Sequence, residues 1–276
     1  SSQLRTLRLN TPSLPEQQKI ASFLSAVDEK IQPLSRKKAL LEAYKKGVRQ
    51  QIFPSTGSGQ RSQQIRFKDE NGNDYRDWEE KKLNDVVEIM TDYVASGSFE
   101  SLRNNVTVYD ELEYALYVRL TDLRHNLKHN KLKYVDKFSY EFLSKSNLYG
   151  GELLIANIGA NVGDVYMMPY DFGRATIAPN MIMIRENMKY YSSKYLFYCL
   201  NSYEGRKAVN RAISGSGQPK LSKTDFKNVK VLLPSVQEQK RIESLLTGVD
   251  IRIESVEKEI SQTEAFKKGL LQKMFV

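Results

Sequence analysis

The sequence predicts an α+β protein in which one mixed α/β domain is flanked by two long helices that form an antiparallel coiled coil. Three observations predict this fold. Nearly the same stretch occurs close to both ends of the chain, each copy carries apolar residues at alternating steps of four and three, and the residues between the copies contain short alternating runs typical of strands. A length of 276 residues is sufficient for one such domain with helical extensions.

Composition narrows the class of protein. Hydrophobic residues make up 40% of the chain, which can support a core, and no run of about 18 apolar residues indicates a membrane span. The single Cys199 excludes an internal disulfide and fits a reducing compartment, most simply the cytoplasm. The formal charge of +9 indicates, weakly, a polyanionic partner.

The repeat becomes clear when the sequence is placed against itself at an offset of 222 residues. Glu16-Gln17 then falls on Glu238-Gln239, and the match continues without a gap for more than forty residues. Other matched positions are Pro12-Ser13 with Pro234-Ser235, Val27-Asp28 with Val249-Asp250, and Lys45-Lys46-Gly47 with Lys267-Lys268-Gly269. A match of this length indicates a duplication.

Each copy is predicted to be a long helix, about 60 Å if all of it is helical. The apolar seam comprises Ile20, Leu24, Val27, Ile31 and Leu34 in the first copy and Ile242, Leu246, Val249, Ile253, Val256 and Ile260 in the second. Such spacing favours a left-handed coiled coil, in which the polar seam residues Lys38, Lys45 and Lys267 could fix the register. Pro33 predicts a kink, or a helix that restarts there.

The seams have two interpretations. Each apolar seam could pack on its own domain, but two duplicated seams separated by about 158 residues fit better as partners in one antiparallel pair.

Before each helix lies an apolar alternation, "LRTLRLNTPS" and "FKNVKVLLPS", that predicts a strand. The predicted divisions are a terminal strand of an adjoining domain (1–10), a first arm (11–53), a flexible linker, natural or engineered (54–64), a central domain (65–232) and a second arm (233–276).

The central domain is predicted to mix strands and helices. The strand candidates are 116–120, 153–158, 165–168 and 181–184, and the helix candidates are 140–144, weakly, and 193–213. Residues 65–113 are mainly acidic, whereas two basic stretches follow. The first contains Arg119, Arg124, Lys128, Lys131, Lys133, Lys137 and Lys145, and the second contains Arg206, Lys207, Arg211, Lys220 and Lys223. If the two share a face, they predict a phosphate-binding surface, with the acidic segment elsewhere; ordinary solvated faces are the alternative.

Several segments together resemble the specificity (S) subunits of type I restriction-modification enzymes. The first is a strand followed by the residues LP, x, EQ and KI, in that order, and then by a long helix that ends in "KKGLLQKMF". The other three are the opening segment "IRFKDENGNDYRDWEEKKLNDVV" (65–87), the interior segment "GGELLIANIGANVGDVYM" (150–167) and the closing segment "SGSGQPKLSKTDFKNVKVLLP" (214–234). The resemblance covers essentially the whole chain. Each motif is weak alone, but their combination is specific.

The resemblance implies a function and partners. In that family two target recognition domains alternate with two helices, and each domain reads one half of a split site on double-stranded DNA. The assembly includes modification (M) subunits, expected to bind S-adenosylmethionine, and through them restriction (R) subunits. This chain, with one complete recognition domain, departs from the pattern. It would work alone, as a homodimer of half-subunits, or as part of a longer chain, and we expect it to hold no cofactor.

Base reading needs polar groups on short turns backed by cations, and three loops offer such groups: 91–98, 157–163 and 214–220. Asn and Gln can bond adenine bidentately, and glycine lets the backbone approach closely. The candidate DNA-contacting residues are Arg119, Arg124, Lys128, Asn157, Gly159, Asn161, Gly163, Arg211, Ser216, Gln218 and Lys220. For Gly159 and Gly163, a simple hairpin turn is the alternative.

Sequence motifs that would indicate a catalytic site are weak. His125 and His129 have helical metal-ligand spacing but lack an HExxH glutamate, so solvated side chains are the better interpretation. The sequence contains neither a GxxxxGK[ST] loop nor a [DN]PP[YFW] methyltransferase motif. We therefore expect a non-enzymatic DNA recognition subunit. The alternative is a coiled-coil scaffold whose central domain binds another protein.

Overall fold

The computed structural model describes residues 12–53, 65–128, 131–187, 189–215 and 217–274. The predicted first strand (1–10) and the linker (54–64) lie outside these residues. The chain divides into two compact units, one formed by the segments up to Gly47 and from Thr247 onward, the other by Val48–Leu246. We call them the helical unit and the recognition unit, and each is described by itself.

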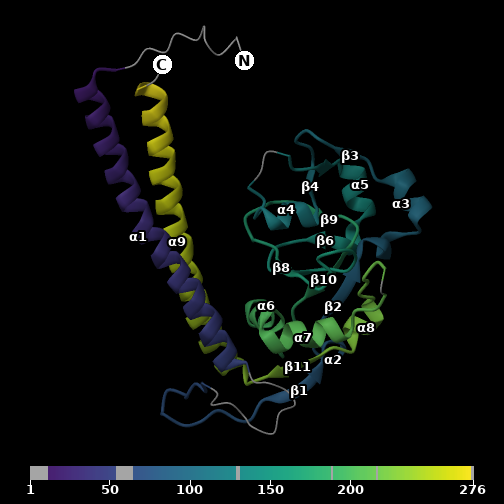
Figure 1. The fold of residues 1–276 in the computed structure, drawn as a ribbon. Helices are drawn as coiled ribbons and strands as arrows, with labels where there is room; N and C mark the ends of the chain where they lie inside the picture. Colours follow the sequence, from purple (N-terminus) through teal and green to yellow (C-terminus); the bar gives the residue numbers. More distant parts are fainter. Residues whose placement is uncertain (1–11, 54–64, 129–130, 188, 216, 275–276) are drawn as a thin grey trace. The chain divides into compact units, whose positions relative to one another are not determined.

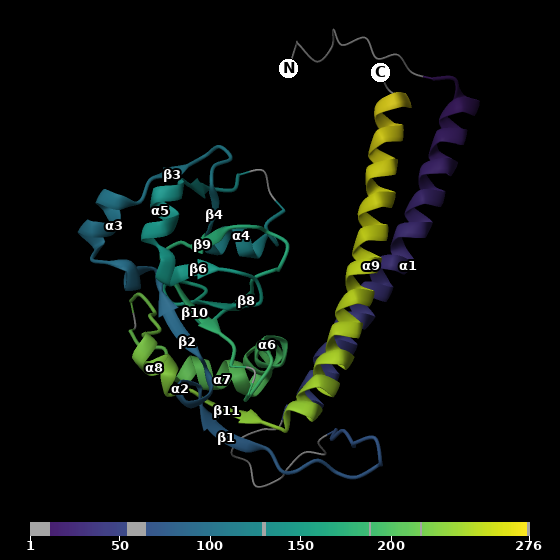
Figure 2. The same ribbon diagram turned by 180° about the vertical axis from the view of Figure 1, so that it is seen from behind.

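The helical unit is built from the larger parts of two helices of 39 residues each, α1 (Leu14–Ile52) and α9 (Val236–Met274). They lie side by side and run antiparallel in both views (Figures 1 and 2). Lys267 Nζ lies 2.5 Å from Asp28 Oδ1, and Lys38 Nζ lies 2.8 Å from Glu257 Oε1. The later residue of α1 therefore pairs with the earlier residue of α9. This order confirms the predicted antiparallel coiled coil.

Most of the predicted seam lies between the two helices. Val27, Val249 and Val256 are buried, whereas Ile20, Leu24, Ile31, Leu34, Ile253 and Ile260 are half-buried. Ile242 and Leu246 are fully buried, in a core that also contains Val48 and Ile52 of α1 together with residues of the recognition unit. The lysines predicted in the seam reach acidic partners, since Lys45 pairs with Asp250 as Lys267 does with Asp28.

Helix α1 continues through Pro33 without a restart. Proline there has no amide hydrogen to donate to the preceding turn, a loss that usually costs about 3 kcal/mol. The helix survives because packing along the seam on both sides of Pro33, at Ile31 and Leu34, holds it. The expectation of a restarted helix was therefore wrong.

The recognition unit combines three sheets in its described residues. One pairs β1 (Glu79–Lys82) with β11 (Lys230–Leu233). A second has the order β2 (Ile89–Asp92), β10 (Met181–Arg185), β7 (Leu153–Ala156), β8 (Val165–Met167). A third has the order β3 (Val108–Tyr109), β5 (Tyr134–Val135), β4 (Ala115–Val118), β9 (Ala175–Ile177), β6 (Asn147–Leu148).

Short helices connect and cover these strands. They are α2 (Leu83–Val86), η2 (Tyr93–Ser96), α3 (Phe99–Asn105), α4 (Leu120–Arg124), α5 (Lys137–Phe142), η3 (Ser144–Ser146), α6 (Ser193–Asn201), α7 (Tyr203–Arg211) and α8 (Lys223–Lys227). Helices α6, α7 and α8 lie at one end of the unit, beside β11 (Figure 1). The mixture confirms the predicted α+β class.

The four-stranded sheet is buried on both faces. Along β7, Leu153 and Ile155 join a core with residues of α6, α7 and α8, whereas Leu154 joins a second core with residues of the five-stranded sheet. In β10, Ile182 likewise joins the first core and Met183 joins the second. Successive strand side chains point to opposite faces, so a doubly covered strand reads as a continuous apolar run.

The predicted helix over 193–213 is two helices, α6 and α7, separated at Ser202. Ser202 has extended backbone, and its hydroxyl accepts a hydrogen bond from Gly205 N, which caps α7. A side chain at Gly205 would lie 2.0 Å from Cys199 O, because the two helices approach closely.

Two other predicted boundaries differ from the structure. The strand predicted over 116–120 ends at Val118, because Arg119 caps α4. The apolar alternation before the second arm forms α8 before β11, since Ser222 caps that helix.

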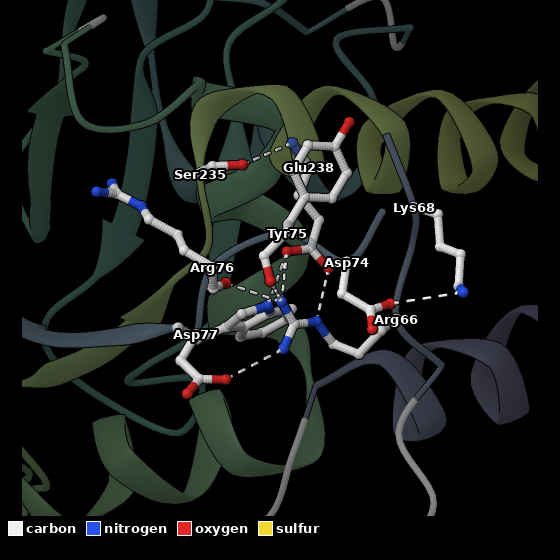
Figure 3. A network of polar contacts seen from close by, with 9 residues as sticks. Arg66, Lys68, Asp74, Tyr75, Arg76, Asp77, Ser235 and Glu238 are labelled. Atoms are coloured by element: carbon white, nitrogen blue, oxygen red, sulfur yellow. Dashed lines mark hydrogen bonds and ion pairs between the residues drawn. The ribbon is translucent and has the colours of Figure 1, made fainter. Parts of the chain in front are cut away.

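A buried carboxylate joins the start of α9 to the opening segment of the recognition unit (Figure 3). Glu238 is fully buried, and Arg66 donates to it from Nε at 2.9 Å and from Nη2 at 3.1 Å. Trp78 Nε1 donates to the same carboxylate at 3.1 Å. The charge is therefore both paired and hydrogen-bonded, as a buried charge must be.

Candidate nucleic-acid interface

The candidate site begins where strands of two sheets end. Strands β4 and β9 are parallel, so their carboxyl ends share an edge, and Ala178 N donates to Val118 O at 2.8 Å. Two residues further, Asn180 O accepts from Asn157 N at 3.1 Å, at the carboxyl end of β7. The turn 178–180 therefore brings the ends of β4, β7 and β9 together.

The segment after β7 is a hairpin turn that leads into β8. Gly163 N donates to Ala156 O at 2.8 Å, and Val162 N donates to Gly159 O at 3.1 Å. Gly159 and Gly163 have φ values of 94° and 87°, in the left-handed region that favours glycine. The hairpin thus accounts for both glycines, and the half-buried Asn161 lies in the turn between them.

The loop 214–220 lies against this hairpin. Pro219 O accepts from Gly159 N at 3.1 Å, and Leu221 N donates to Asn157 O at 2.9 Å. Ser214 and Lys220 exchange two backbone hydrogen bonds of 2.9 Å, which close the loop. Gln218 and Lys220 are exposed, whereas the predicted Ser216 lies outside the described residues. We call residues 157–163 and 214–220 the paired loops.

Asn157 is distinctive within the paired loops. Its side-chain oxygen Oδ1 is buried and has no hydrogen-bond partner within the described part of the chain. A buried acceptor left unpaired costs about 1–3 kcal/mol, so it is stabilised by any ligand or water that donates to it. Asn157 is joined through its backbone to the exposed Asn180.

The predicted basic residues are distributed around the paired loops rather than within them. Arg119 follows β4 directly, but its guanidinium donates to the buried Asp122 at 2.7 Å and 3.1 Å and to Lys131 O at 2.7 Å. The hydrogen bonds that Arg119 donates to the Asp122 carboxylate raise the pKa of Arg119. Arg119 therefore already uses donors that bidentate reading of a base would need.

The remaining predicted cations are exposed. Arg124 ends α4, and Lys128 follows it. Arg211 ends α7 and lines a cavity of about 400 Å³ together with Ala208, Asp225 and Lys230. The structure thus brings together Asn157, Gly159, Asn161, Gly163, Gln218 and Lys220; it places Arg119 at the adjoining strand end, and Arg124, Lys128 and Arg211 on helices or beyond them.

Residues of the acidic segment lie beside both basic stretches. Asp92 of β2 lies 3.0 Å from Lys223 Nζ, and Asp110 pairs with Lys133. The acidic segment supplies β2 and β3, which are edge strands of the two larger sheets, so its side chains mix with both basic stretches. These pairs reduce the positive charge that the sequence alone suggested.

One residue at the site, Asn180, was missed from the sequence; it is exposed with φ 71°. Lys223 begins α8 and forms an ion pair with Asp92 that was not predicted. The dipeptide Pro179-Asn180 between two strand candidates is a recognisable turn signal that could have indicated Asn180. Lys223 was counted only as one of a basic stretch, because its ion pair depends on a contact distant in sequence.

The described residues give little support for a metal site or a reactive thiol. Among the described residues, no three His, Cys, Asp or Glu side chains are grouped to hold a metal ion, and His129 is not one of those residues. Burial raises the pKa of the Cys199 thiol to about 12. Of the helices the structure describes, none is long and apolar enough to cross a membrane.

Comparison with known proteins identifies the family. The model of the type I restriction modification DNA specificity domain matches residues 1–43 and 75–265, most of the chain. The chain belongs to this specificity family. Its matched region includes the strand ends and the paired loops described above.

Named relatives and solved structures agree with that membership. The specificity-family chain is 26% identical over 208 residues to the MjaX specificity subunit, and 24% identical over 273 residues to the MjaVIII specificity subunit, both from Methanocaldococcus jannaschii. These matches cover 72% and 96% of this chain but 45% and 60% of the relatives. The chain therefore spans about half to three fifths of their length.

The same fold occurs in solved structures of the family. The HsdS subunit from Thermoanaerobacter tengcongensis matches with a TM-score of 0.54 at 18% identity, over 97% of this chain and 60% of that one. The S subunit from M. genitalium matches with a TM-score of 0.55 at 16% identity, over 96% and 62%. At these identities the likeness concerns the fold.

Proposed function

We propose that the chain is a non-catalytic DNA recognition subunit of a type I restriction-modification system, reading one half of a bipartite site. The observation that carries this proposal is the pair of loops held at the ends of β4, β7 and β9. The loops present amides, glycines and a lysine on rigid backbone, at an edge formed by buried strands. Family membership supplies the class of ligand, duplex DNA.

The chemistry of the paired loops suits an edge of a base pair. Gln218 is exposed on one loop, and Asn157 of the other loop has a buried side-chain oxygen with no hydrogen-bond partner among the described residues. Amides can donate to and accept from a base in the major groove, and glycines let the backbone come near. The exposed Lys220, Arg124 and Lys128 are placed to contact phosphates, which fix orientation without reading sequence.

The partners follow from the same proposal. Duplex DNA is held by the recognition unit, and the helical unit serves as a spacer and as a docking surface for M subunits, which bring R subunits. S-adenosylmethionine belongs to the M subunit, and this chain works in the cytoplasm. Because the chain spans 45% and 60% of its relatives, the second half-site is read by a second copy or by further chain.

DNA binding is tested by titrating a labelled duplex with the chain and its M subunit at several salt concentrations. The affinity should fall as salt rises, because phosphate contacts release counterions. Lys220→Ala should weaken binding to all sequences and reduce the salt slope by about 1. Gln218→Ala should reduce discrimination between sequences, by about 1–3 kcal/mol at one position.

Lys240→Ala is the matched control, because Lys240 is exposed at the start of α9, outside both basic stretches and the paired loops, and should leave both quantities unchanged. An affinity that depends on neither salt nor sequence would favour the alternative, a coiled-coil scaffold that binds another protein.

A further inference from the structure

The recognition unit contains a cavity of about 400 Å³ between α7 and β11, two elements that lie side by side in both views (Figures 1 and 2). Sites for small ligands usually have volumes of about 300–1,000 Å³. Much of the wall is apolar, and this part is formed by Phe53, Cys199, Ala208, Ala212, Val229 and Val231. A ligand of the cavity therefore has an apolar body.

Strand β11 presents one backbone donor and one acceptor to this cavity. Leu83 N, just after β1, donates to Val229 O at 2.9 Å. Bonded and non-bonded pairs alternate along antiparallel strands, so Val231 also bonds to β1. The N–H and C=O of Lys230, which lies between these two residues, point to the other edge of β11 and line the cavity.

This unbonded stretch of the edge is one residue long. The next position that faces the same way is Leu232, whose carbonyl accepts from the Tyr195 hydroxyl of α6 at 2.7 Å. Helix α6 therefore covers the edge beyond Lys230, and an extended peptide added to β11 could not continue there. A small molecule needs only one adjacent donor and acceptor, so the geometry favours a small molecule over a peptide.

The face of α7 that lines the cavity has small residues between charged ones. Glu204, Gly205, Ala208, Arg211 and Ala212 all line it, at spacings that place them on one side of the helix. From Glu204 to Arg211 this face extends about 10 Å, at 1.5 Å per residue. A flat ring can lie against the small residues, with polar groups beyond its ends.

The charges of the wall disfavour an anionic ligand. Three carboxylates and two cations line the cavity: Glu80, Glu204, Asp225, Arg211 and Lys230. Lys230 Nζ lies 2.9 Å from Glu80 Oε2, so these two charges cancel. Asp225 Oδ2 accepts from the Ser222 hydroxyl at 2.5 Å, which leaves Oδ1 to accept from another group. An uncharged molecule with hydroxyl donors complements this wall better than a phosphate does.

We propose that the cavity binds an uncharged nucleoside. The edge of its base, with a ring-nitrogen acceptor beside an amino donor, pairs with the N–H and C=O of Lys230, and its ring lies against Ala208 and Ala212. Its ribose hydroxyls donate to Asp225, as they donate to a carboxylate in dinucleotide sites. The paired loops take no part in this site, so it does not depend on the reading of DNA.

Binding can be measured at the Lys230 amide in the 276-residue chain. Val229-Lys230 is the only Val-Lys dipeptide in the sequence, so carbonyl-¹³C valine combined with ¹⁵N lysine isolates a single NMR resonance. Adenosine should move this resonance in a saturable way, because a new hydrogen bond forms at that amide. A ligand of this size usually binds with a Kd of about 0.1 mM.

Three related molecules test the assigned contacts. N6,N6-dimethyladenosine lacks the amino donor, and 2′,3′-dideoxyadenosine lacks the ribose donors, so each should bind about tenfold more weakly or worse. AMP should also bind more weakly than adenosine, because its phosphate meets the carboxylates. In Asp225→Asn, the difference between adenosine and the dideoxy compound should shrink, a coupling that a merely structural role of Asp225 would not produce.

A matched pair of variants tests the location. Ala208→Leu fills the cavity and should abolish the response to adenosine, whereas Asn210→Leu, at an exposed α7 position outside the cavity wall, should preserve it. Circular dichroism verifies that both variants are folded.

Four outcomes would each overturn the inference. These are a Lys230 resonance that does not move at roughly 5 mM adenosine, an equal response to indole, tighter binding of AMP than of adenosine, and an undiminished response in Ala208→Leu. An equal response to indole would show an unselective apolar cavity, and tighter binding of AMP would show an anion site. DNA binding by the same chain is measured separately, so either proposal can fail without the other.

Discussion

Cys199 is buried in the core of the recognition unit, where its thiol has low reactivity. It is 6% exposed, and the neighbouring Tyr195 hydroxyl donates to Leu232 O at 2.7 Å, which ties α6 to β11. Burial raises the thiol pKa from 9.0 to about 12. The thiolate is therefore disfavoured in the folded chain, and the residue acts in packing rather than in nucleophilic chemistry.

This shift predicts a pH dependence of stability. Because the folded-state pKa is raised, the contribution of Cys199 is complete below pH 9 and is lost as pH rises toward 12. By pH 10 the loss should be about 1.4 kcal/mol. Urea unfolding at pH 8 and pH 10 should therefore show a larger decline for the unaltered chain than for Cys199→Ala. Equal declines would mean that the thiol ionises as easily in the folded chain as in the unfolded one.

At the scale of elements, the contact between α6 and α7 depends on one glycine. In an exposed helix position, replacing glycine by alanine stabilises by about 0.5–1 kcal/mol. At Gly205 the added methyl carbon would lie 2.0 Å from Cys199 O and 2.7 Å from Leu200 Cα, both backbone atoms that cannot rotate away. Gly205→Ala should therefore destabilise, by about 2 kcal/mol or more.

Gly248 provides the matched comparison, because it lies in α9 with nothing within 4 Å of an added carbon. Gly248→Ala should raise the free energy of unfolding, whereas Gly205→Ala lowers it, as measured by urea denaturation. A stabilising Gly205→Ala would show that α6 and α7 separate easily.

Elements differed in how well they could be predicted from the sequence. The long helices were predictable, because a repeat with alternating steps of four and three is a strong local signal. Strands β7 and β10 were predictable as well, since burial on both faces leaves continuous apolar runs. The break at Ser202 was not, because its cause is the approach of Gly205 to the backbone of α6, a contact with no apolar period of its own.

The candidate site was predicted in part. Its loops were recognised from clustered Asn, Gln and Gly, residues with distinct turn and hydrogen-bonding properties. Their pairing depends on the bonds from Gly159 to Pro219 and from Leu221 to Asn157, which join residues about sixty positions apart. Arg119 was expected to be available for a base, but its ion pair with Asp122 arises from the start of α4, a boundary that the predicted strand had obscured.

For the whole molecule, the division into two units predicts that recognition is transferable. The proposed base-reading residues lie within Val48–Leu246, so residues 65–232 grafted into another specificity subunit should change the half-site that is methylated. The methylation pattern of a genome containing many sites measures this directly. The same graft carrying Gln218→Ala should methylate a broader set of sites. An unchanged pattern would place sequence selection outside this domain.

The ion pairs Lys45–Asp250 and Asp28–Lys267 bear on the history of the chain. Asp250 is the repeat counterpart of Asp28, and Lys267 is the counterpart of Lys45, so each copy contributes the same aspartate and the same lysine to the two bonds. A single ancestral helix with both residues would complement another copy of itself laid in the opposite direction. The repeat is therefore self-complementary: the same aspartate and lysine positions would support an antiparallel pair whether the two copies lie in one chain or in two.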